Sequence, residues 1–92
     1  MPELPRISGD EAIAVFRALG FLEVRQRGSH VVLRRGGEGC VIPRHKELAL
    51  GTLRSAIRQA GISVEEFVAA WGRYIRDWIV PTLQRGNDPV SD

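Results

Sequence analysis

The 92-residue sequence contains one cysteine, Cys40, and no long hydrophobic run. A single cysteine cannot form an internal disulfide, which agrees with a reducing compartment. A membrane-spanning helix needs about 20 consecutive apolar residues, and no stretch of this chain approaches that length. The N-terminal stretch MPELPRISGDE has two prolines and no apolar core, so it does not read as a secretory signal. These absences predict a cytoplasmic protein that does not act at a membrane.

The short length leaves room for one domain with one two-layer core. A separate cofactor-binding domain would not fit beside it, so we expect no cofactor. The composition, 43% hydrophobic and 26% charged, is that of an ordinary soluble globular protein.

Positive charge is concentrated in the middle of the chain. Between Arg25 and Arg58 there are eight lysines and arginines against two glutamates, so this segment carries +6 although the whole chain carries only +2. The flanking segments together therefore carry −4. A basic middle favours a surface that binds phosphates, whereas arginines scattered over several faces would be the ordinary alternative.

The apolar pattern predicts an α+β fold. Helical spacing and capping residues predict a helix from about Ser8 to Leu19, a second from Leu50 to Ala60, and a third from Ser63. Alternating residues and turn signals between them predict three short antiparallel strands, at about residues 21–26, 30–34 and 40–42. We expect the helices to cover one face of this sheet, and we expect Pro81 to end the last helix before a frayed tail.

His30 stands at the start of the second predicted strand, directly after Gly28 and Ser29. Val31 and Leu33 should share the face that packs on the helices, which leaves His30 and Arg34 on the open face. A lone histidine is most often inert, and here it could simply cap a strand end. A Gly-Ser turn among arginines changes that balance, because turn amides and guanidinium groups bind phosphate.

A histidine beside a bound phosphate is suited to RNA cleavage by the RNA's own 2′-hydroxyl. The base removes the hydroxyl proton, and cations stabilise the negative charge that builds on the phosphate. The candidate catalytic residue is therefore His30. The candidate RNA- or phosphate-binding residues are Arg27, Gly28, Ser29, Arg34, Arg44, His45 and Lys46.

Other assignments for these side chains remain open or are disfavoured. His45 could be a second acid, a phosphate contact or an ordinary loop residue. A metal site made of His30, His45 and Cys40 matches no common spacing. Cys40 lies in an apolar strand, where a thiol usually belongs to the core rather than acting as a nucleophile.

Four stretches follow one another over roughly residues 3 to 70: LPRISGDEAIAVFRALGF, RQRGSHVVLRR, VIPRH and GTLRSAIRQAGISVEEF. In this order they resemble the HicA toxins of bacterial toxin–antitoxin pairs. The resemblance implies a fold like that of a double-stranded-RNA-binding domain and a metal-independent mRNA endonuclease (an mRNA interferase) that inhibits translation. It assigns the catalytic role to the histidine after Gly-Ser, here His30. It also implies a HicB-like antitoxin as partner, with operator DNA bound only through the antitoxin complex.

The chain divides, on this interpretation, into a toxin-like domain at residues 1–70 and a C-terminal helical extension and tail at 71–92. Trp71, Ile75 and Trp78 would form an apolar stripe on the extension. The stripe could fold back on the core or bind the antitoxin or a second copy. Two functional alternatives also stand beside the nuclease: a non-catalytic RNA-binding module and a purely structural partner protein.

Overall fold

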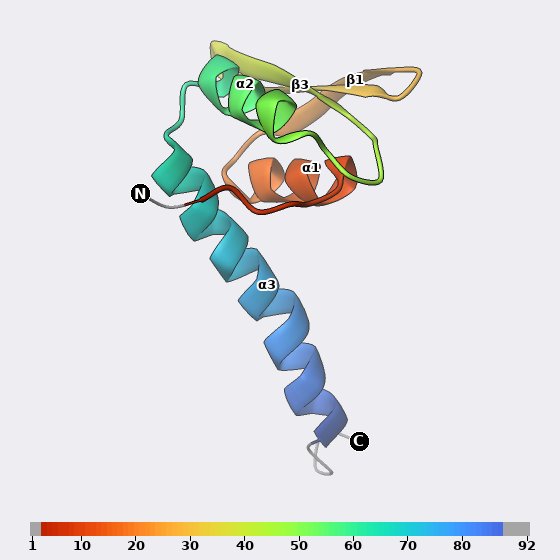
Figure 1. Ribbon diagram of the computed structural model, residues 1–92, viewed down its shortest axis with the longest axis vertical. Coiled ribbons are helices and arrows are strands. Elements are labelled where there is room, and N and C mark those ends of the chain that lie inside the picture. Colours follow the sequence, from red (N-terminus) through yellow and green to blue (C-terminus); the bar gives the residue numbers. More distant parts are fainter. Residues whose placement is uncertain (1–2, 88–92) are drawn as a thin grey trace.

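The computed structural model describes the backbone of residues 3–87 and the side chains of residues 3–75. Its α+β architecture is the predicted one: a helix, a three-stranded antiparallel sheet and two further helices (Figure 1). The elements are α1 (Gly9–Ala18), β1 (Leu22–Arg27), β2 (His30–Arg35), β3 (Glu38–Pro43), α2 (Leu50–Ala60) and α3 (Val64–Asn87).

The sheet has the order β1-β2-β3, so each strand pairs with its neighbour in the sequence. Val31 and Leu33 of β2 are fully buried, whereas His30 and Arg34 are exposed, as the alternation predicts. The pairing of β1 with β2 shifts between Glu23 and Arg25. This bulge places one extra residue in β1. The alternation of buried and exposed residues along β2 and β3 gives the sheet an apolar inner face and a largely exposed open face.

Local sequence signals determine where the helices begin and end. The Ser8 hydroxyl accepts from the Glu11 backbone N–H at 3.0 Å, and the Glu11 carboxylate accepts from the Ser8 N–H at 2.9 Å. Ser63 and Glu66 make the same reciprocal pair before α3. Both predicted capping boxes are therefore present, and Gly61 ends α2 in the left-handed region with φ +74°.

Three phenylalanines join the helices to the sheet in one core. The Phe16 ring of α1 lies 5.3 Å from the Phe21 ring, just before β1, and 5.3 Å from the Phe67 ring of α3. All three are fully buried. Edge-to-face and tilted contacts of this kind add to the free energy of burial, so the three rings hold α1, the start of the sheet and α3 together.

The last helix differs from the prediction. Pro81 does not end it, and α3 continues to Asn87, leaving the body of the molecule as an extended rod (Figure 1). A proline has a helical φ and removes one backbone donor, so a helix can pass through it at a cost. Trp71 is half-buried against the core and stacks on Tyr74 at 5.6 Å. The side chain of Trp78 and residues 88–92 of the expected tail lie outside what the structure describes.

No helix in the described part of the chain is both long and apolar enough to cross a membrane.

Candidate functional site

His30 is the first residue of the central strand β2, at the hairpin end of the sheet. Its Cα partners are Arg27 on β1 and Pro43 on β3. The His30 side chain is exposed and makes no hydrogen bond or ion pair within the described residues. The His30 ring therefore lies in solvent at the hairpin end of the open face, beside Arg27 on the neighbouring strand.

The turn before His30 is held by two hydrogen bonds to its backbone carbonyls, one from the Gln26 side chain and one from the Arg44 backbone. Gly28 has φ +55°, a conformation that side-chain-bearing residues rarely adopt. The Gln26 amide donates to the Gly28 carbonyl at 2.9 Å, and the Arg44 N–H donates to the Ser29 carbonyl at 2.7 Å. The second bond ties the turn to the segment after β3. The Ser29 hydroxyl and the turn backbone remain exposed beside His30.

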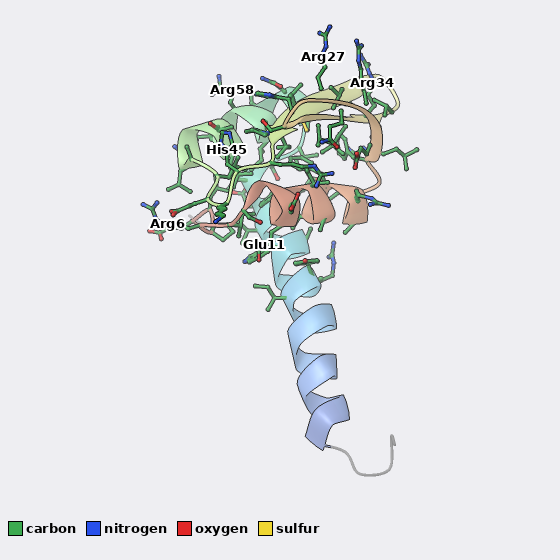
Figure 2. All side chains as sticks on the ribbon, turned by 90° about the vertical axis from the view of Figure 1, so that its right-hand side faces the viewer. Arg6, Glu11, Arg27, Arg34, His45 and Arg58 are labelled. Carbon is green, nitrogen blue, oxygen red and sulfur yellow. The ribbon has the colours of Figure 1, made fainter. Side chains whose placement is uncertain are left out.

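Arg27 and Arg34 both project from the open face. Figure 2 shows the two side chains pointing away from α1, and both are exposed. Arg34 lies four residues beyond His30 on β2, about 13 Å along the strand. Arg25 belongs to the same face, because its Cα partner is Val32. Sequence reasoning missed Arg25 as a site residue, although its two-residue spacing from Arg27 would have placed it there.

Arg44, His45 and Lys46 form a second group, in the segment between β3 and α2. Arg44 is paired with the Asp10 carboxylate of α1 and lies 3.6 Å from the Glu23 carboxylate of β1. His45 and Lys46 are exposed, and the His45 carbonyl accepts from the Gly9 N–H at 2.8 Å. In Figure 2 His45 lies well apart from Arg27 and Arg34. The predicted cations therefore fall into two separate groups.

Arg35, which the charge count included, has a structural role. Its guanidinium donates to the Leu19 carbonyl at 2.8 Å and lies 4.7 Å from the centre of the Phe21 ring. These contacts connect the end of β2 to the loop after α1. The positive charge on the open face is therefore smaller than the sequence count suggests.

Cys40 points into the core, with 3% of its surface exposed. Burial raises the pKa of its thiol from 9.0 to about 12. The charged thiolate is the nucleophile in thiol chemistry, so this residue is suited to packing and not to catalysis. No group of three metal-binding side chains occurs among the described residues.

We predict that Cys40 resists alkylation in the folded protein. Iodoacetamide at about pH 8 should label it roughly a thousandfold more slowly than in urea-unfolded protein, since the thiolate is the reactive form. Because its pKa is raised on folding, the stabilising contribution of the protonated thiol is present below pH 9.0 and decreases as the pH rises toward 12. Mass spectrometry of timed samples measures the labelling. Equal rates in the two states would contradict the buried position.

A family model described as "HicA toxin of bacterial toxin-antitoxin" matches residues 9–62, which is more than half of the chain. The matched span begins with α1 and ends just after α2, so it contains the whole sheet and His30. No curated protein shows a significant match to the chain.

Proposed function

The chain belongs to the HicA toxin family of bacterial toxin–antitoxin systems, and on that basis we propose that it is an endoribonuclease that cleaves mRNA with His30 as the general base. The observation that carries this proposal is the position of His30. Its imidazole is exposed and makes no hydrogen bond or ion pair within the described residues. Arg27, its Cα partner, lies beside it on the neighbouring strand β1. An imidazole exchanges its proton readily near neutral pH, which a base in this reaction must do.

The proposed reaction uses only groups of the RNA and the protein. His30 takes the proton from a ribose 2′-hydroxyl, the O2′–P bond forms, and the P–O5′ bond breaks. The departing O5′ takes a proton from the imidazolium or from water. The products are a 2′,3′-cyclic phosphate and a 5′-hydroxyl. Arg27 would stabilise the additional negative charge on the phosphate during the transfer. The nucleophile belongs to the substrate, so the reaction needs no metal-bound water.

The remaining predicted RNA contacts differ in how directly they could act. The Gly28–Ser29 turn and the side chains of Arg27 and Arg34 are exposed on the sheet side. His45 and Lys46 belong to the second group, between β3 and α2. Both are exposed and could bind a neighbouring phosphate of the RNA. Arg44 would have to exchange a carboxylate partner for a phosphate, because Asp10 and Glu23 already neutralise it.

Membership of the family implies a cognate antitoxin partner. We propose that this partner is HicB-like, that the pair binds operator DNA only as a complex, and that it acts in the cytoplasm. We further propose that residues 1–70 form the toxin unit and that 71–92 are an accessory extension. The proposed boundary falls within α3.

The test is cleavage of a defined RNA by the purified chain in the presence of EDTA. We expect products that end in a 2′,3′-cyclic phosphate and begin with a 5′-hydroxyl, identified by mass spectrometry. A single 2′-deoxy substitution at the cut position should block cleavage there, because it removes the nucleophile. Expression without the antitoxin gene should arrest growth.

Tight RNA binding without any cleavage would overturn the nuclease and favour the alternative, a non-catalytic RNA-binding module. The specific observation behind that alternative is that the open-face arginines would bind phosphates whether or not His30 reacts. A chain that neither binds RNA nor arrests growth would overturn both functions.

A further inference from the structure

The open face of the sheet consists of three cross-strand rows, and each row contains one arginine. In order from the β1–β2 hairpin, the rows are Arg27–His30–Pro43, Arg25–Val32–Val41 and Leu22–Arg34–Gly39. Successive rows are two β2 residues apart, about 7 Å along the strands. Positive groups therefore recur at regular intervals, beginning beside His30 and ending at Arg34.

These three arginines have no acidic partners among the described residues. Arg25, Arg27 and Arg34 are exposed and take part in no ion pair or hydrogen bond there. By contrast, Arg6 is paired with Glu47, and Arg35 and Arg44 are held by the contacts described above. A guanidinium without a carboxylate partner is free to bind a phosphate at no cost of breaking an ion pair.

The far end of the face is hollowed. Gly39 leaves room for the Arg34 side chain to cross β3, since a Cβ at Gly39 would lie 3.4 Å from the Arg34 Cγ. A shallow hollow lies here, lined by Val32, Arg34, Gly39, Cys40, Val41 and Gln59. Gln59 comes from α2, which therefore forms one wall. Figure 2 shows Arg58 of α2 on the same side of the molecule as Arg27 and Arg34.

From this arrangement we infer that the substrate is a single strand of RNA that lies across the open face, from His30 to the hollow beside Arg34. The inference rests on the proposed function and adds the class of substrate and its path. Arg27, Arg25 and Arg34 bind successive phosphates, and Gln59 and Arg58 contact the strand at the far end. Apart from the His30 imidazole, the floor has aliphatic side chains and no aromatic ring for base stacking, so phosphate binding dominates.

The dimensions and charges favour a single strand over a duplex. Domains that read double-stranded RNA contact about 16 base pairs across two minor grooves. The six-residue strands of this sheet extend only about 20 Å. The fold resembles that of a duplex-binding domain, but three arginines without an acidic partner among the described residues, Arg25, Arg27 and Arg34, lie together on the sheet.

The experiment measures binding separately from cleavage. The probe is a fluorescent 2′-O-methyl RNA about 12 nucleotides long, which lacks the attacking hydroxyl, alone or annealed to its complement. Anisotropy titrations at several salt concentrations should show at least about tenfold tighter binding of the single strand. Arg25→Ala and Arg34→Ala should each weaken binding and lower the slope of log K against log salt by about 0.7, the value for one phosphate contact on a single strand.

Arg17→Ala is the matched control, because it removes one exposed arginine from α1, outside the open face. It should leave both affinity and slope unchanged. Equal binding of duplex and single strand would overturn the inference, and so would an Arg17→Ala defect as large as that of Arg25→Ala. If the Arg25 and Arg34 variants keep RNA affinity and lose antitoxin binding, the face binds protein and the inference is also wrong. If the single strand binds tightly and through these arginines but unmodified RNA is not cleaved, the proposed path is supported. Only the proposal of nuclease activity would then be wrong.

Discussion

Replacing His30 by alanine is expected to lower the rate of RNA cleavage by about 10²- to 10⁴-fold, the usual contribution of a positioned base. The same variant should fold as the parent does, because the His30 ring is exposed and has no hydrogen-bond partner among the described residues. RNA affinity should also remain, since the arginines that bind phosphate are untouched. Growth arrest on expression should disappear with cleavage.

A second substitution, His30→Gln, separates proton transfer from simple hydrogen bonding. Glutamine retains a donor and an acceptor but cannot take up a proton near neutral pH. Both variants should therefore lose activity to a similar extent, measured as single-turnover rates at saturating enzyme, with urea denaturation confirming the fold. Cleavage by His30→Gln at the parent rate would mean that the residue positions the substrate and that the base lies elsewhere.

Replacing Gly9 by alanine is expected to lower the free energy of unfolding by about 3 kcal/mol, at the upper end for inserting a methyl group into a packed site. A Cβ at Gly9 would lie 2.0 Å from the Pro43 carbonyl oxygen and 2.9 Å from the Arg44 Cα. Both atoms belong to the backbone and cannot rotate away. The clash would separate α1 from the end of β3 and break the hydrogen bond from the Gly9 N–H to the His45 carbonyl.

Gly51→Ala provides the matched control. Gly51 lies in the first turn of α2, is exposed, and has no atom within 4 Å of a built Cβ. Alanine favours the helix over glycine, so this variant should be more stable by about 0.5–1 kcal/mol. Urea denaturation of the three proteins measures the difference. A Gly9→Ala protein as stable as the Gly51→Ala protein would contradict the close approach of α1 to β3.

The features that the sequence predicted well are set by local interactions. Ser8 with Glu11 and Ser63 with Glu66 satisfy backbone groups within one turn of helix, so their spacing is sufficient to place the helix starts. The side of the sheet that carries His30 follows from two-residue alternation with Val31 and Leu33. These predictions required no knowledge of distant parts of the chain.

The features that the sequence did not predict depend on contacts between distant residues. The pairing of Arg44 with Asp10 joins positions 34 residues apart, and no spacing rule reports it. The contribution of Gln59 to the hollow depends on α2 lying beside β3. No sequence pattern predicts the bulge near Val24 either, yet this bulge moves Leu22 onto the face that carries Arg34. For α3, the prediction that Pro81 ends the helix was wrong. The cost of one lost backbone hydrogen bond did not stop the helix at that residue.

The bulged strand β1 has one more consequence. In the sheet order it has a neighbour on one side only, so its other edge presents unpaired N–H and C=O groups. Such an edge can recruit strands of other molecules and start aggregation. The irregular register and the exposed guanidinium groups of Arg25 and Arg27 oppose this, because two such edges would match poorly and would bring these like charges together. The arginines assigned here to RNA would thus also keep copies of the chain from joining edge to edge.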